Sequence, residues 1–207
     1  MKKIMLRCKP LLLCTLLAGC SYNPNGTPDN WLQSHGLQSE SRETLRLCRN
    51  FGCSDRGTVR FSAEDMAQIR ALFTPQSRSP EEERQRIANA IGLMETISGP
   101  QLNTVADLAK NDFALSNRSN QLDCIAESLN TSRYLLTLEQ QGLLQFHRTG
   151  GNAHRGPLRL SAPHNSATIR QLSNQQGFAV DSWFRGNGEP AWVVPIEIWL
   201  SGNDPAE

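Results

Sequence analysis

The chain has 207 residues, of which 38% are hydrophobic and 20% are charged. This length is sufficient for one domain with a sizeable hydrophobic core. The formal net charge is only +1, so the composition gives no reason to expect a nucleic acid as the partner.

The first nineteen residues have the features of an export signal. Basic residues precede a short apolar stretch, residues 11–17, which falls well below the roughly 20 apolar residues that a membrane-spanning helix needs. The tetrapeptide Leu17-Ala18-Gly19-Cys20 that follows resembles the lipobox of bacterial lipoproteins. This resemblance implies cleavage before Cys20 and lipidation of its thiol, and Ser21 in the next position implies the outer membrane.

We therefore expect residues 1–19 to be a signal peptide that is removed. Four basic residues leave with it, so the mature chain carries three more acidic than basic residues. The mature protein is expected to be anchored to the membrane through Cys20, with its domain facing the periplasm. No nucleic acid is expected as a partner.

Two segments are expected before the main domain. Residues 20–41 are rich in Asn, Pro, Gly and Ser and lack apolar periodicity, which predicts a flexible tether. Residues 42–110 form a predicted helical region. Ser62 begins a capping sequence followed by apolar residues at helical spacing, and Pro80 begins a second helix that Gly99-Pro100 is expected to end.

Cys48 and Cys53 are separated by only four residues. Because the periplasm permits disulfides, we expect these two cysteines to pair with each other. Their spacing is wider than the Cys-x-x-Cys of catalytic dithiols, which weakens a redox function for the pair without removing it as an alternative.

Residues 111–207 are predicted to form an α+β domain. A third helix is expected from Cys124 to about residue 141, ending at Gly142. Short apolar runs separated by Gly, Asn and Pro then predict antiparallel strands, at 143–147, 158–161, 167–172, 178–182 and 192–194. Helices followed by strands predict an α+β fold in which one central helix packs on an antiparallel sheet.

Cys124 is the cysteine that neither the signal nor the predicted disulfide accounts for. Asp123 is a suitable cap for the third helix, which places Cys124 in its first turn. Unpaired N–H groups and the helix dipole stabilise a thiolate there, and the same N–H groups can hold an oxyanion. Gln121, just upstream, is a candidate second donor to that oxyanion.

A thiol nucleophile needs a base, and the base needs an orienting partner. His164 precedes the predicted strand at 167–172, and Asp181 lies in the predicted strand at 178–182. If these strands are antiparallel neighbours, the start of one lies opposite the end of the other. His164 and Asp181 are therefore the predicted base and its orienting carboxylate.

The order and spacing of Cys124, His164 and Asp181 resemble the transglutaminase-like and papain-like cysteine enzyme superfamily, over about residues 121–200. This resemblance implies acyl transfer through a thioester, with water or an amine as acceptor, as in a cysteine peptidase, an amidase or a transglutaminase-like acyltransferase. The implied substrate is a protein, a peptide or peptidoglycan. No metal-binding loop is evident in the sequence, and no cofactor and no metal are expected. Asp123 and Ser182 depart from the residues usual beside the cysteine and the acid in transglutaminases.

Several alternatives remain open at this point. His147 and His154 are rival bases, and with Cys124 they are also candidate zinc ligands. Glu127 either tunes the site or is a solvated or packing carboxylate. The aromatic residues Trp183, Trp192 and Trp199 either line a groove or belong to the core. The chain as a whole is then either an enzyme or a non-catalytic interaction module of the same fold, with Cys124 as a buried structural thiol.

Overall fold

The computed structural model describes residues 21–38, 41, 43–111, 119–156 and 163–205. The predicted signal peptide and Cys20 lie outside these residues. In chain order the described elements are α1 (Asp29–Ser34), β1 (Thr44–Cys48), the 3-10 helix η1 (Phe51–Cys53), β2 (Arg56–Arg60), α2 (Ala63–Ala71), α3 (Pro80–Leu102), α4 (Cys124–Gln140), β3 (His147–Thr149), β4 (Ala153–Arg155), β5 (His164–Gln171), β6 (Gly177–Asp181), β7 (Trp192–Pro195) and α5 (Ile196–Leu200). Helices and antiparallel sheets coexist, so the predicted α+β class is confirmed.

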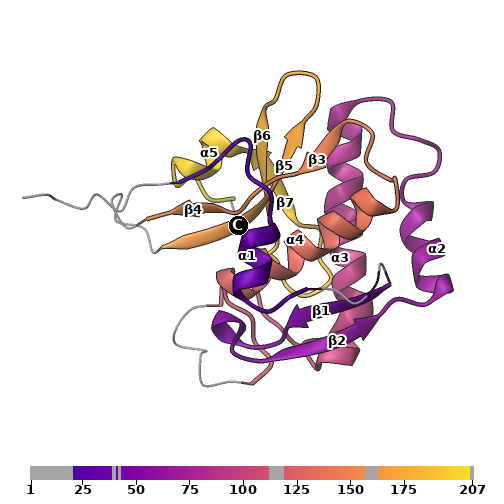
Figure 1. Cartoon of the computed structure of the whole chain (residues 1–207), viewed down its shortest axis with the longest axis vertical. Coiled ribbons are helices and arrows are strands. Elements are labelled where there is room, and N and C mark those ends of the chain that lie inside the picture. Colours follow the sequence, from indigo (N-terminus) through magenta and orange to yellow (C-terminus); the bar gives the residue numbers. More distant parts are fainter. Residues whose placement is uncertain (1–20, 39–40, 42, 112–118, 157–162, 206–207) are drawn as a thin grey trace, which may run out of the picture.

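The main sheet has the strand order β3-β5-β6-β7, and β4 pairs with β5 beside β3. Every pairing is antiparallel. Phe178 and Val180 of β6 belong to the large core shared with α3 and α4, whereas Ala179 faces the other side of the sheet, because successive side chains of a strand alternate. The fully buried Trp199 of α5 covers that second side. Figure 1 shows α3 to the right of the sheet and α5 to its left.

The helix boundaries follow local capping signals. Ser62 and Asp65 form a capping box at α2, and Ser79 caps α3 just before Pro80. The expected end of α3 at Gly99-Pro100 is wrong by one turn, because α3 continues to Leu102 and ends at Asn103 in the left-handed conformation (φ 62°). A proline in the last turn removes one helical hydrogen bond, and asparagine tolerates this left-handed end.

Residues 21–38 do not form the predicted flexible tether. Ser21 pairs with His154 of β4, and Leu32 and Leu37 are buried in a cluster with the first turns of α4. The prediction is wrong for these residues because a few isolated apolar side chains, without helical periodicity, make contacts that only the folded domain supplies.

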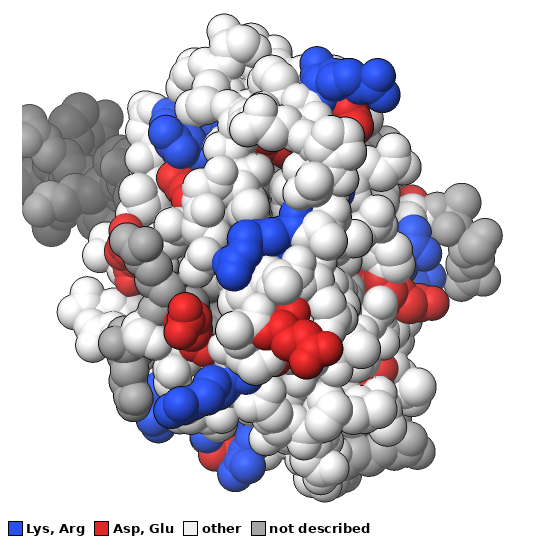
Figure 2. Space-filling model, turned by 90° about the vertical axis from the view of Figure 1, so that its right-hand side faces the viewer, with Lys and Arg blue, Asp and Glu red and all other residues white. Residues whose placement is uncertain are grey.

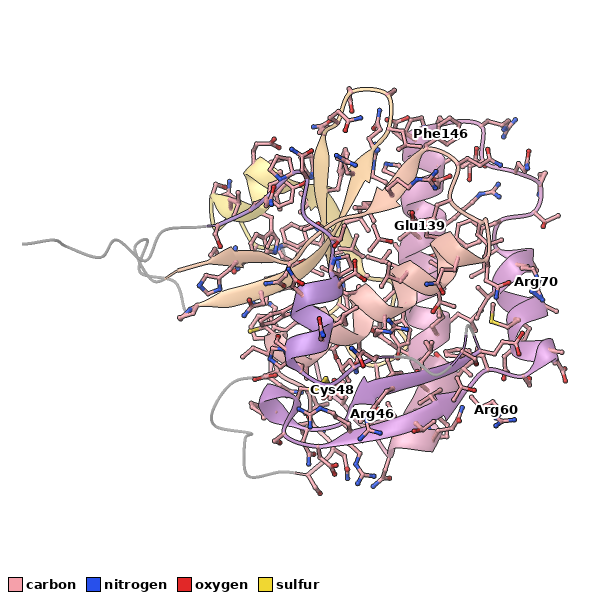
Figure 3. The ribbon with its side chains drawn as sticks, in the orientation of Figure 1. Arg46, Cys48, Arg60, Arg70, Glu139 and Phe146 are labelled. Carbon is pink, nitrogen blue, oxygen red and sulfur yellow. A yellow bond between two sulfur atoms is a disulfide. The ribbon has the colours of Figure 1, made fainter. Side chains whose placement is uncertain are left out.

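The predicted helical region 42–110 also contains a hairpin that the sequence did not indicate. β1 and β2 pair antiparallel from Thr44 opposite Arg60 to Cys48 opposite Arg56. Leu45, Leu47 and Val59 turn into the main core. Arg46 and Arg60 lie on the outer face of the hairpin (Figure 3). The predicted Cys48–Cys53 disulfide closes the end of this hairpin and is confirmed.

Three of the predicted strands are present in the structure. β5, β6 and β7 overlap the predicted strands at 167–172, 178–182 and 192–194. The strand expected at 143–147 is wrong except at His147, because Gly142 and Leu143 instead close the end of α4, with the Leu143 N–H bonded to the Leu138 carbonyl. The strand expected at 158–161 lies outside the described residues.

Charged side chains of both signs share the face that α2 and the start of α3 present. At the start of α3, Arg86 and Glu82 are 2.6 Å apart and Arg84 and Glu81 are 2.9 Å apart. Figure 2 shows this face, on the right of Figure 1, with Lys and Arg interspersed among Asp and Glu. This face therefore carries no extended field of one sign.

A buried amide joins the hairpin to α4 and provides a test of the fold. The Asn130 side chain accepts a hydrogen bond from the Cys48 N–H at 2.8 Å and donates one to the Cys48 carbonyl at 3.0 Å. We expect Asn130→Ala to lower the free energy of unfolding by about 2–4 kcal/mol, because two buried backbone groups lose their partner. Urea denaturation measures this loss. Gln140→Ala, at the exposed end of the same helix, should change it by less than about 0.5 kcal/mol; equal effects of the two variants would contradict the prediction.

Candidate active site

Cys124 is the first residue of α4 and is the free cysteine of the described chain. The Asp123 carboxylate caps this helix by accepting from the Ala126 N–H at 2.9 Å, and its second oxygen accepts from the Gly52 N–H at 2.9 Å. The helix start is thus fixed to the disulfide-closed end of the hairpin. Cys124 itself is only half-buried, so its thiol is accessible while its backbone is held.

The first N–H groups of α4 remain available beside this thiol. The Asp123 carboxylate accepts from the Ala126 N–H. The N–H groups of Cys124 and Ile125 lie in the first turn, where an α-helix offers them no carbonyl partner. They donate to no other described residue. Backbone N–H groups at a helix start, next to a nucleophile, are suited to holding a developing oxyanion.

His164 and Asp181 lie side by side, as the antiparallel pairing of their strands predicts. His164 is the first residue of β5 and Asp181 the last of β6. The His164 Nε2 and the Asp181 Oδ2 are 2.7 Å apart, and both residues are buried, with 3% and 2% of their surfaces exposed. This burial removes competing water from the hydrogen bond.

The Cys124 side chain lies beside His164, close enough to contribute to its raised pKa, and completes the arrangement. Because Asp181 occupies Nε2, the nitrogen that remains for the thiol is Nδ1. The structure therefore brings together the predicted nucleophile, base and orienting carboxylate from α4, β5 and β6. The rival His147 lies elsewhere, in a fully buried pair with Glu83 at 2.8 Å.

Two opposing effects set the pKa of His164. Burial acts to lower this pKa, but the charge and hydrogen bond of Asp181, together with the hydrogen bond and charge of Cys124, raise it from 6.5 to about 9. His164 is therefore an imidazolium at neutral pH. A cation of this kind beside a cysteine stabilises the thiolate, which is the nucleophilic form.

Trp199 is a component of the site that sequence reasoning left undecided between groove and core. Its indole Nε1 donates to the Asp181 Oδ2 at 2.6 Å, and its ring lies 5.5 Å from the His164 ring at an interplanar angle of 30°. Trp199 thus holds the carboxylate and covers the His164–Asp181 pair. The sequence carries no signal for this contact, because the five residues of α5 are too few to show a helical period.

Other aromatic side chains enclose the remaining faces of the histidine. The rings of Trp183 and Phe184 lie 4.6 Å and 5.2 Å from the His164 ring. The Arg155 guanidinium lies 4.9 Å from the Trp199 ring and donates to the Trp199 carbonyl at 3.0 Å. These contacts fix the orientation of His164 toward Cys124.

Gln121, the candidate second oxyanion donor, is buried and engaged in the loop that precedes α4. Its Nε2 donates to the Ala106 carbonyl at 2.9 Å, and its Oε1 accepts from the Asn111 side chain at 2.8 Å. One of its two amide N–H groups is therefore used by the loop. Its function as an oxyanion donor stays a prediction.

Within the described ranges, no group of three or more His, Cys, Asp or Glu side chains is arranged to hold a metal ion. The suggested zinc site of Cys124, His147 and His154 is therefore not formed. A cavity of about 380 Å³ lies away from Cys124, His164 and Asp181, between α3 and β7. The residues that line it are Gln85, Ala88, Asn89, Arg185, Glu189, Pro190, Ala191, Trp192 and Val193.

Comparison with known proteins adds no further information about this site. No family model matches the chain, and it matches no curated protein and no solved structure. None of the described helices combines the length and the apolar character needed to cross a bilayer. The function is therefore argued from the geometry.

The raised pKa of His164 predicts how stability depends on pH. The folded state holds this proton more tightly than the unfolded chain, so its stabilising effect is complete below pH 6.5 and is lost as the pH rises toward about 9. We expect the loss over this range to be roughly 3 kcal/mol. Urea denaturation of the wild type and of His164→Asn between pH 6 and pH 9.5 measures it as the difference between the two curves. A difference that does not change with pH would contradict the assignment.

Proposed function

We propose that this protein is a thiol-dependent acyl-transfer enzyme of the transglutaminase-like or papain-like kind, which cleaves or exchanges amide bonds. The observation that carries the proposal is that Cys124 lies beside His164, that His164 is hydrogen-bonded to Asp181, and that Trp199 donates to the same carboxylate. A nucleophile, a base in contact with it and a third group that orients the base are the recurring requirements of covalent catalysis.

The reaction proceeds in two steps that the geometry supports. The Cys124 thiolate attacks the carbonyl carbon of an amide, the N–H groups at the start of α4 hold the oxyanion, and the His164 imidazolium gives its proton to the leaving amine. The C–N bond breaks and a thioester remains on Cys124. Water or a second amine then attacks the thioester while His164 removes its proton, and the thiolate leaves. Asp181 keeps the imidazole in place through its hydrogen bond to Nε2.

The position of the chain after Cys20 supports a substrate near the membrane. Ser21 exchanges two backbone hydrogen bonds with His154 of β4, and β4 pairs with the start of β5, where Arg155 lies opposite His164. Two strand spacings, about 10 Å, therefore separate Ser21 from the start of β5. Lipidation of Cys20 would hold the catalytic histidine close to the bilayer surface. We accordingly propose a lipid-anchored protein of the outer membrane that faces the periplasm and acts on a protein, a peptide or peptidoglycan.

The reactivity of Cys124 tests the nucleophile and base. We expect iodoacetamide to alkylate Cys124 rapidly at pH 7, and His164→Ala to slow the reaction by roughly tenfold or more, because a thiol without such a partner is only a few per cent ionised there. Mass spectrometry after proteolysis assigns the label, and the Cys48–Cys53 pair serves as the internal unlabelled control. Slow alkylation that His164→Ala leaves unchanged would favour the interaction-module alternative.

Acyl-enzyme formation tests the chemistry itself. We expect an activated acyl ester, p-nitrophenyl acetate, to leave an acetyl group on Cys124, because the thiolate forms a thioester with any accessible activated carbonyl. Cys124→Ala should carry none of this adduct, and Asp181→Asn should form it more slowly at unchanged fold. Intact-protein mass spectrometry with peptide mapping measures both. Labelling of Cys124→Ala at the same rate as the wild type would contradict the proposal.

A further inference from the structure

Three carboxylic side chains meet in the interior directly behind the candidate active site. Glu95 comes from α3, Asp107 from the loop that follows α3, and Glu127 from α4, and 8%, 5% and 6% of their surfaces are exposed. The Ser182 hydroxyl donates to the Glu127 Oε2 at 2.6 Å and lies near enough to Glu95 to affect the pKa of that carboxyl. Thr131 lies 2.9 Å from the same hydroxyl. We call Glu95, Asp107 and Glu127 the carboxyl cluster.

The carboxyl cluster contacts both halves of the candidate site. Asp107 Oδ1 accepts from the Leu122 N–H at 2.8 Å, two residues before Cys124. Ser182, bonded to Glu127, directly follows Asp181. The cluster therefore connects the chain that leads into the nucleophile with the chain that leaves the orienting carboxylate.

The close contact inside the carboxyl cluster requires a proton. The side chains of Asp107 and Glu127 lie close enough to interact directly and to shift each other's pKa, and two ionised carboxylates offer only acceptors and repel each other. One of the two must therefore be a carboxylic acid. The Glu95 Oε2 accepts from the Gly188 N–H at 3.2 Å, while its other oxygen is buried without a hydrogen-bond partner, a situation that costs far less for a neutral carboxyl than for an ionised one.

The charges around the carboxyl cluster agree with this protonation. Burial, followed by the charge of Asp107, raises the pKa of Glu95 to about 8, and burial raises the pKa of Asp107 to about 6. Burial, then the charges of Glu95 and Asp107, raise the pKa of Glu127 well above its ordinary value.

Tyr134 of α4 faces the carboxyl cluster, and burial followed by the charge of Glu95 raises the pKa of this tyrosine. On the side of the sheet, Ser182, which contacts Glu127, directly follows Asp181, which is paired with His164. At neutral pH, Asp107 carries the negative charge and Glu95 and Glu127 carry protons.

We propose that Glu127, Asp107 and Glu95 are positioning residues, and that the protons retained on Glu127 and Glu95 hold Leu122 and Ser182 together, and with them the Cys124–His164–Asp181 arrangement. The proposal rests on the proposed function only in assigning Cys124 as the nucleophile. When the pH rises and a proton leaves, two carboxylates face each other in a buried site and repel. The loop with Asp107 and the residue after Asp181 then move apart, and the thiol loses its alignment with His164.

Glu127→Gln separates this proposal from a merely structural function of the carboxyl cluster. A glutamine amide donates to Asp107 and accepts from Ser182, as the protonated glutamate does, but it has no proton to lose. In the wild type, the unfolding equilibrium constant should rise by roughly tenfold per pH unit for each retained proton, between pH 4.5 and pH 8. Glu127→Gln should reduce this dependence on pH. Glu139→Gln is the matched control, because Glu139 is another glutamate of α4 that accepts a hydrogen bond (from the Thr149 N–H, at 2.8 Å). It lies at the other end of α4 (Figure 3) and should leave the dependence unchanged.

The reactivity of Cys124 supplies the second measurement. We expect iodoacetamide alkylation of the wild type to fall relative to Glu127→Gln as the pH rises into the alkaline range, because burial raises the pKa of Glu127, whereas the two proteins should react alike at pH 6. Glu127→Ala, which cannot make either hydrogen bond, should react slowly at every pH. Should Glu127→Gln fail to fold, Asp107→Asn replaces it, because asparagine accepts from Leu122 and donates to Glu127.

The outcomes are distinguishable from failure of the proposed function. If the unfolding of the wild type and of Glu127→Gln depends equally on pH, the claim that Glu127 retains a proton is wrong. If Glu127→Gln reduces the pH dependence of unfolding but is alkylated like the wild type at every pH, the claim that the carboxyl cluster positions Cys124 is wrong. If His164→Ala leaves Cys124 alkylation unchanged, the proposed function fails, while the comparison of unfolding curves still decides whether the carboxyl cluster holds its proton.

Discussion

The buried hydrogen bond between His164 and Asp181 is the interaction on which the candidate site depends. Burial by itself favours a neutral imidazole, and an isolated buried carboxylate is costly, so each group makes the other's charge tolerable. Trp199 supplies the further donor that Asp181 needs, and its ring excludes water. Helix α5 thus holds the carboxylate that raises the pKa of His164, the histidine beside the start of α4.

The start of α4 is held by segments from several parts of the chain. Asp123 binds Gly52 at the closed end of the hairpin, Asn130 binds Cys48, and Leu122 binds Asp107. These contacts are polar, directional and largely buried, so each one restricts rotation as well as distance. The position of the thiol is therefore a property of the whole core, although only one helix carries it.

Local signals predicted the elements that have strong local causes. The caps Ser62, Ser79 and Asp123 each satisfy a helix start within three residues, and such contacts are encoded in a short stretch of sequence. The short apolar runs of β5 and β6, with a turn sequence between them, similarly indicated the pairing that brings His164 to Asp181. The hairpin β1–β2, the packing of residues 21–38 and helix α5 were missed because their stability comes from distant partners, with too few residues to show a period.

The sequence alone determined that Cys124 begins a helix, that His164 begins a strand and Asp181 ends its neighbour, and that Cys48 and Cys53 are close enough to pair. Each follows from interactions between residues near in sequence or from the period of a strand. Only the tertiary structure decided that Trp199 binds Asp181, that Gln121 is engaged by its own loop, and that Glu95, Asp107 and Glu127 meet behind the site. Burial and long-range neighbours set a pKa, so the protonation of His164 and of the carboxyl cluster is decided by the fold.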